Sequence, residues 1–204
     1  MGAMKIKHAI VSICIIGLFI GCSTGEQTTR EGDTGAVVQT LSNRGITITA
    51  QYLNNKMLYD RFGTRNNPFI EYLEQPPVVI NFTMSSEEAM RFRLGRVKIF
   101  YLNEWMRPVG RVSLNSYWES VLRNQGVAQT GTAKRYKNWS YNSVSQVITQ
   151  NVLQDTVDIV PGSEQTGLML FQGISNRSGT ARIEIPIYNM NGAEVHEFIF
   201  IIDT

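Results

Sequence analysis

Residues 158–172 read DIVPGSEQTGLMLFQ, and this stretch decides the fold. Pro161-Gly162 is a turn dipeptide, and the apolar run GLMLF at 167–171 is typical of a buried strand. We expect the dipeptide to join two core strands. Leu168, Leu170 and Phe171 are then expected to fill the space between two sheets.

The segment that follows alternates in the manner of a half-buried strand. Residues 181–190 (ARIEIPIYNM) place isoleucines at every second position, and Asn191-Gly192 predicts a hairpin turn into a last strand over 194–202. Pro186 has no N–H to donate, so it is expected at a sheet edge or a bulge.

Turn signals separate several further short segments. Strands are predicted over residues 45–52, 78–84, 92–102, 109–114 and 156–160. Residues 115–124 and 142–153 repeat apolar side chains at three- and four-residue spacings, which predicts two helices. The predicted fold class is therefore mainly β, an antiparallel sandwich with one or two short helical inserts.

The N-terminus has the pattern of an exported protein. Lys5 and Lys7 precede the apolar run AIVSICIIGLFI at 9–20. This run is too short for a membrane-spanning helix and has the length of a secretory signal's apolar region. Gly21 and Cys22 follow it, and this junction resembles the bacterial lipobox, in which the signal is cut just before a lipidated Cys.

That resemblance implies a domain organisation. Residues 1–21, starting at Met1 or Met4, would be the lipoprotein signal peptide, and Cys22 the lipidated first residue. Ser23 is similar to the residue found in outer-membrane lipoproteins, so the body would be in the periplasm or at the cell surface. Residues 22–43, which are Thr-, Gly- and charge-rich, predict a flexible tether before a domain over 44–204. An ordinary secretory signal and a short membrane anchor are the alternatives.

The stretch 158–172 also resembles a pattern seen in lipoproteins of uncharacterised bacterial families. The Asn67-Pro68-Phe69 segment and the two helical segments are similar too, so the likeness covers most of residues 44–204. It implies an immunoglobulin-like β-sandwich. It supplies no catalytic residues, because this fold hosts many functions.

Charge and residue counts exclude several functions. The chain has 19 Lys and Arg against 17 Asp and Glu, and without Lys5 and Lys7 the numbers are equal. A neutral domain has no overall field that attracts nucleic acid. After Cys22 there is no further Cys, and His196 is the single His. An internal disulfide, a Cys-ligated zinc site and a Cys nucleophile are therefore excluded from the mature body.

The acidic residues do not form a catalytic pattern. Glu87-Glu88 follows two serines and is expected at a turn or helix start, while Asp155 and Asp158 lack the spacing of a calcium loop. His196 lies in a predicted strand without partners for catalysis or metal binding. No catalytic residue, metal or cofactor is predicted.

Two clusters are candidate binding surfaces. A predicted loop interleaves cations with aromatic side chains that can stack on sugars or anchor an interface: Lys134, Arg135, Tyr136, Trp139 and Tyr141. Packing of Trp139 in the core is the alternative. In the second cluster, alternation places Arg91 and Arg93 on one face of a strand and Arg96 and Lys98 on the other. Either a solvated sheet face or a site for an acidic partner or a lipid headgroup explains the second cluster.

These features predict a non-enzymatic lipoprotein that serves as an interaction or assembly subunit of a cell-envelope complex. A glycan- or peptidoglycan-binding module that uses Trp139, Tyr136 and Trp105 is the second hypothesis. A hydrolase with a diffuse carboxylate site is the third.

Overall fold

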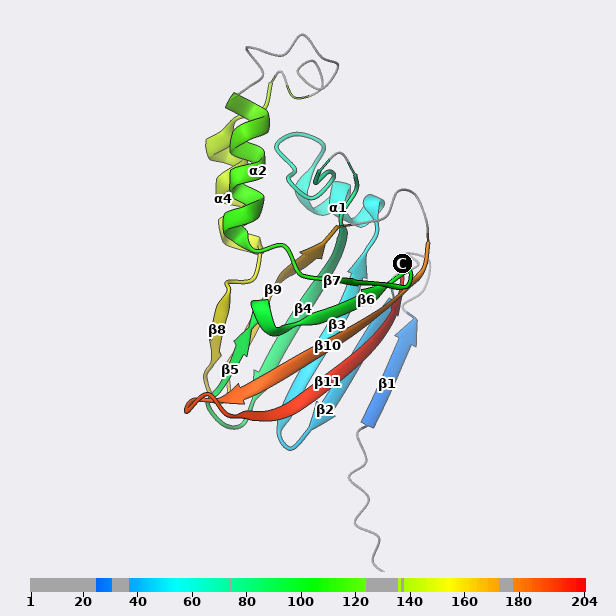
Figure 1. Cartoon of the computed structure of the whole chain (residues 1–204), viewed down its shortest axis with the longest axis vertical. Helices are drawn as coiled ribbons and strands as arrows, with labels where there is room; N and C mark the ends of the chain where they lie inside the picture. Colours follow the sequence, from blue (N-terminus) through cyan, green and yellow to red (C-terminus); the bar gives the residue numbers. More distant parts are fainter. Residues whose placement is uncertain (1–24, 31–36, 74, 124–135, 137, 173–177) are drawn as a thin grey trace, which may run out of the picture.

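The structure, a computed structural model, describes residues 25–30, 37–73, 75–123, 136, 138–172 and 178–204. Two antiparallel sheets pack face to face in these ranges, and short helices gather over one end (Figure 1). The predicted fold class, a mainly β antiparallel sandwich with helical inserts, is confirmed.

Each sheet is built from antiparallel pairs. The first sheet has the order β1 (Gly25–Arg30), β2 (Val37–Asn43), β3 (Ile46–Leu53), β4 (Val78–Ser86) and β9 (Glu164–Phe171). The second is centred on β10 (Thr180–Asn189), which pairs with β11 (Glu194–Asp203) along one edge. Its other edge pairs with β6 (Lys98–Tyr101) and then β5 (Met90–Arg93). Beyond them lie β7 (Glu104–Met106), next to β6, and β8 (Thr156–Ile159), next to β5.

Alternating apolar side chains fill the space between the sheets. Ile46, Ile48 and Ala50 on β3 are fully buried there, while the threonines between them are half-buried on the outer face of the sheet. From β4 and β11, the rings of Phe82 and Phe200 meet edge to face with centroids 5.9 Å apart. The two-residue period of a strand thus explains why the predicted strands at 45–52 and 181–190 are found.

A helical layer covers one end of the first sheet on its outer face. It comprises α1 (Asn55–Phe62), α2 (Arg111–Arg123) and α4 (Tyr141–Asn151) (Figure 1). Leu168 and Leu170 on β9 point into this layer, so their predicted place in the sandwich is wrong. Met169 and Phe171 occupy the sandwich instead, because successive side chains of a strand point to opposite faces.

The helices differ from the predicted ones at their starts. The predicted strand at 109–114 is wrong, because α2 begins at Arg111 and only Val109 bridges to β9, with its N–H donating to the Leu170 carbonyl at 2.7 Å. Helix α1 was not predicted. Its signals are local: the Asn54 side chain accepts from the Met57 N–H at 3.0 Å, and Gly63 ends the helix at φ 73°.

The predicted long strand over 92–102 is interrupted. A 3₁₀ turn, η1 (Leu94–Arg96), separates β5 from β6. On β10, residues 181–184 pair with β6 and residues 187–189 with β5, so Pro186 lies where this edge has no partner. Pro186 is therefore found at a break in the ladder beside the bulge at Ile187 and Tyr188, as its missing N–H requires.

The sheet begins earlier than the sequence predicts. A flexible tether is expected over 22–43, whereas residues 25–30 and 37–43 form β1 and β2. Polar side chains on β2 find hydrogen-bond partners in both sheets. Thr40 shares a hydrogen bond with Thr49 on β3 at 3.0 Å, and Gln39 accepts one from the Ile201 N–H of β11 at 3.0 Å. Hydrogen bonding between strands therefore orders a segment that is poor in apolar residues.

Trp118→Ala should destabilise the fold strongly. The side chain is fully buried in the helical layer, and its Nε1 donates to the Pro68 carbonyl at 3.1 Å. Loss of a buried Trp costs about 3–5 kcal/mol. The exposed Trp105 is the matched control, and Trp105→Ala should change the free energy of unfolding by less than about 1 kcal/mol. Urea unfolding measures both, and equal effects would contradict this description of the core.

Candidate functional site

The predicted recognition loop does not present its aromatic residues as an open platform. Lys134 and Arg135 lie outside the described residues. Tyr136 is buried and donates its hydroxyl to the carboxylate of Glu71. Trp139 is half-buried and stacks on Trp118 with ring centroids 5.1 Å apart, which agrees with the core alternative.

Tyr141, the remaining aromatic residue of that loop, belongs to helix α4. Tyr141 is half-buried at the first position of α4. The physical reason for this arrangement is the helical layer, which needs large side chains to cover the outer face of the first sheet. In this loop the described aromatic residues therefore contribute mainly to stability.

The acidic residues are at turns and in ion pairs. The Glu88 N–H donates to the Ser86 hydroxyl at 3.2 Å, which places the Glu87-Glu88 pair in the β4–β5 turn. His196 on β11 is half-buried beside Phe198, with ring centroids 6.4 Å apart. No group of three His, Cys, Asp or Glu side chains that could hold a metal ion occurs within the described ranges.

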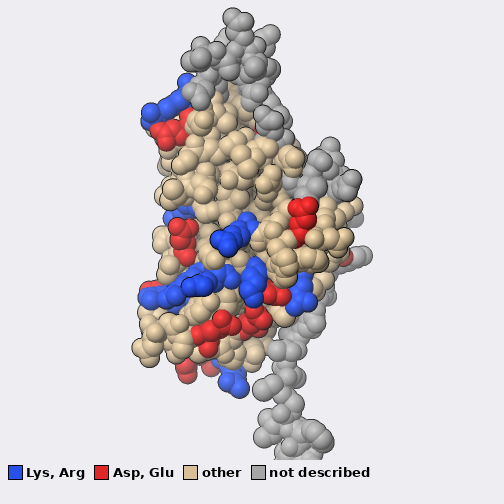
Figure 2. Space-filling model, viewed as in Figure 1, with Lys and Arg blue, Asp and Glu red and all other residues tan. Residues whose placement is uncertain are grey.

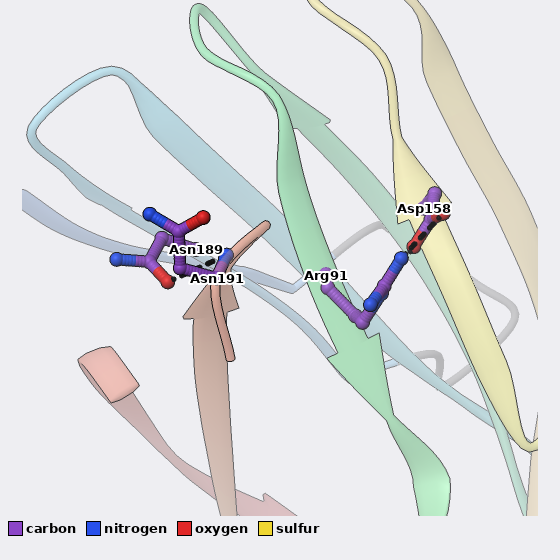
Figure 3. Close-up of polar contacts among 4 residues, drawn as sticks. All are labelled: Arg91, Asp158, Asn189 and Asn191. Carbon is purple, nitrogen blue, oxygen red and sulfur yellow. Dashed lines mark hydrogen bonds and ion pairs between the residues drawn. The ribbon is translucent and has the colours of Figure 1, made fainter. Parts of the chain in front are cut away.

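Arg91 and Asp158 form the best-defined ion pair of the second sheet. They are opposite each other on β5 and β8, and the guanidinium bonds both carboxylate oxygens at 2.6 and 3.0 Å (Figure 3). These hydrogen bonds lower the pKa of Asp158 and raise the pKa of Arg91. The figure also shows Asn189, which accepts from the Asn191 N–H at 3.1 Å in the predicted hairpin turn. The Arg91–Asp158 pair and the Asn189–Asn191 turn therefore stabilise the second sheet.

The other cations of this region share one face, which corrects the expected separation of Arg91 and Arg93 from Lys98. Met90, Phe92, Ile99 and Tyr101 point inward, so Arg91, Arg93 and Lys98 all point to the outer face. The reason is η1, which shifts the alternation between β5 and β6. Arg93 lies 5.1 Å from the ring centroid of Tyr188.

A buried carboxylate holds two of the cations on the outer face. Glu184 on β10 is 8% exposed, and Arg182 and Lys98 approach it at 2.9 and 3.4 Å. Figure 2 shows Lys and Arg side chains gathered across the middle of the molecule on this side, with acidic groups among them. The carboxylate of Glu184 thus offsets part of the positive charge on the outer face of the second sheet.

Beside these pairs lies a hollow with no carboxylate in its lining. We call it the Trp105 hollow; it measures about 410 Å³ and is lined by Gly95, Arg96, Val97, Lys98, Trp105, Met106 and Arg107. Arg96 and Arg107 are exposed and make no hydrogen bond or ion pair with any described residue. A second hollow shares Gly95 and Arg96 with the Trp105 hollow and has Asp155 in its lining, and a third hollow is lined by Asp158.

Trp105 is the most exposed aromatic side chain in the described part of the chain, at 62%. Its ring leans on Phe100 of β6, with centroids 5.2 Å apart. A tight turn at Leu102 and Asn103, which have positive φ of 48° and 67°, connects β6 to β7 and so positions Trp105. The sequence predicts Trp105 only as an additional sugar contact, and Asn103 is the residue that signals its hairpin turn.

Apolar side chains lie on both sides of Arg182 across the outer face of the second sheet. Ile201, Arg182, Phe100 and Trp105 are neighbours in register on β11, β10, β6 and β7. Ile201 is 49% exposed, and Ile199 on the same strand is 39% exposed. We call Phe100, Trp105, Ile199 and Ile201 the apolar stripe. It lies on a sheet face that no described helix covers.

The predicted lipidation site cannot be placed in this geometry. Gly21 and Cys22 lie outside the described residues. Among the helices that are described, none is long and apolar enough to cross a membrane.

The Arg91–Asp158 pair predicts a specific pH dependence. Because the pKa of Asp158 is lowered from its ordinary 3.8 by folding, its contribution to stability is present above that value and is lost as the pH falls through the lowered pKa. Asp158→Asn should therefore destabilise the protein at pH 7 and have a smaller effect at pH 2, as measured by urea unfolding. Asp60→Asn, in the more exposed pair with Lys56, is the control. A difference from wild type that persists undiminished at pH 2 would contradict the assignment.

The chain was compared with models of protein families, with curated proteins and with solved structures, and none of them matched. The candidate site therefore rests on the residues of this chain alone.

Proposed function

We propose that the protein is a lipid-anchored, non-catalytic subunit of a bacterial cell-envelope assembly, located at the outer membrane. The anchor is supported by the apolar run at 9–20 and by Cys22 directly after Gly21. The observation that carries the assembly role is the apolar stripe, in which Trp105, Ile199 and Ile201 are exposed on a sheet face that no described helix covers.

The chemistry of the stripe indicates the kind of partner. Clustered exposed apolar side chains mark interaction surfaces, and buried Trp and Arg contacts dominate binding energy at such surfaces. Arg96, Arg107 and Lys98 lie around the stripe, and Arg182 lies within it. Of these, Lys98 and Arg182 approach the carboxylate of Glu184, whereas Arg96 and Arg107 approach no described carboxylate. The partner is therefore expected to be an envelope protein with an apolar patch bordered by acidic residues.

A pull-down with matched variants tests this proposal. The tagged full-length protein is purified from gently solubilised membranes, alongside Cys22→Ala and the double variant Ile199→Lys/Ile201→Lys. Burial of two added charges should reduce the recovery of copurifying envelope proteins about tenfold or more, and Cys22→Ala should weaken it by removing the anchor. The control Val160→Lys/Met190→Lys adds the same charge at two turns, where both residues are exposed.

Only partners whose recovery depends on the stripe count in favour of the proposal. Recovery that is equal in the stripe variant and in the control, or a wild-type preparation with no copurifying envelope protein, would refute it.

A glycan- or peptidoglycan-binding module remains the second candidate, favoured by the exposure of Trp105. Tyr136 is buried and Trp139 is stacked in the helical layer, so Trp105 is the aromatic residue of that hypothesis left open to a sugar. Wild type should sediment with purified sacculi, and Trp105→Ala should sediment several-fold less. Wild type that stays in the supernatant would remove this candidate.

A further inference from the structure

We infer that the Trp105 hollow binds a sugar that carries a phosphate or carboxylate group. This inference goes beyond the proposed assembly role, because it concerns a small ligand bound by the protein alone. It depends on three observations: the cations in the lining, the packing of the Trp105 ring against Phe100, and the open space around Gly95.

The lining has the electrostatics of an anion site. Three cations, Arg96, Lys98 and Arg107, contribute to it, and there is no Asp or Glu among the lining residues. Lys98 is shared with Glu184 at 3.4 Å, but the two arginines make no contact with a described acidic group. Guanidinium groups bind phosphate and carboxylate oxygens through paired hydrogen bonds, so two unpaired arginines at one hollow favour such a group.

Trp105 supplies an apolar surface next to these cations. Its indole leans on Phe100 at a ring-to-ring tilt of 54°, which limits its movement, while 62% of the residue remains exposed. An indole face stacks on the C–H groups of a sugar ring, whereas the neighbouring arginines need an anionic substituent. A sugar that bears an acidic group satisfies both requirements at once.

The backbone leaves room for a ligand of this size. The η1 turn breaks the ladder at Gly95, where an added Cβ would meet no atom within 4 Å, while the buried Val97 forms part of the floor. The volume of about 410 Å³ is in the range of small-molecule sites. Gly95 is therefore a position in the lining at which a side chain can be added without a clash.

The test is a titration of the purified full-length protein with glucose 6-phosphate and with glucuronate, followed by the indole N–H signals of the three tryptophans in nitrogen-15 NMR spectra. The Trp105 signal, assigned with Trp105→Phe, should shift saturably with at least one of the acidic sugars. Glucose and inorganic phosphate alone should bind at least tenfold more weakly, because each satisfies only one half of the site.

Matched variants locate the binding. Arg96→Gln/Arg107→Gln should weaken binding about tenfold or more, while Lys56→Gln/Arg123→Gln removes the same charge from the helices and should leave it unchanged. Gly95→Glu should weaken binding much more than Gly95→Gln, because it adds a carboxylate to the hollow. All variants are first checked for thermal unfolding like that of the wild type. Gly95→Glu and Gly95→Gln both retain Arg96 and Arg107, so they test the charge of the hollow without removing either arginine.

The inference is overturned if neither acidic sugar shifts the Trp105 signal, or if the shift survives in Arg96→Gln/Arg107→Gln and in Gly95→Glu. Inorganic phosphate that binds as tightly as glucose 6-phosphate would overturn the role of the sugar ring. Phosphatidylglycerol vesicles that shift the signal when the sugars do not would assign the hollow to a lipid headgroup instead. Each readout uses the isolated protein, so failure here is distinct from failure of the pull-down.

Discussion

Burial of one end of the first sheet on both of its faces dictates where the other elements of the structure lie. Met169 and Phe171 point into the sandwich, and Leu168 and Leu170 point into the helical layer, so one strand joins two hydrophobic clusters. A strand buried on both sides needs covering elements, and α2 and α4 provide them while Val109 and Val152 bridge to its free edge. All three described α-helices thereby pack against the first sheet, and none of them covers the outer face of the second sheet.

The arrangement of side chains on the outer face of the second sheet results from one break in the pairing along β10. Pro186 cannot donate a hydrogen bond, and the neighbouring edge of β10 is unpaired between β6 and β5 at this point. The chain crosses the gap as η1, which brings Gly95 and Arg96 to the surface and turns Arg93 and Lys98 to the same side. An uninterrupted strand would have alternated these residues between the core and solvent. The break thus produces both the collection of cations and the hollow beside Trp105.

Local sequence patterns predicted where the strands lie, but they did not predict which elements pack against each strand face. The alternation at 46–50 and 183–187, the Asn191-Gly192 turn and the spacing in α4 depend on neighbours in sequence, and they lie where predicted. Whether an apolar run such as GLMLF has one covering layer or two depends on elements far away in sequence, so Leu168 and Leu170 were misplaced. The burial of Tyr136 was equally hidden from local patterns, because its partner Glu71 is 65 residues away. The Trp105 hollow is formed by η1 and β7, neither of which has a periodic signal long enough to predict.

Trp105 belongs to both the apolar stripe and the hollow, and this links the two proposals physically. A partner protein that covers the stripe would contact one part of the indole, whereas an acidic sugar in the hollow would stack on another and neutralise Arg96 and Arg107. Neutralising these cations would remove part of the attraction for an acidic partner, so the two ligands should oppose each other's binding. Such coupling is reciprocal, and each ligand must weaken the other by the same factor. One surface side chain, fixed by Phe100 and a two-residue turn, would then let the state of a small envelope ligand control an assembly contact.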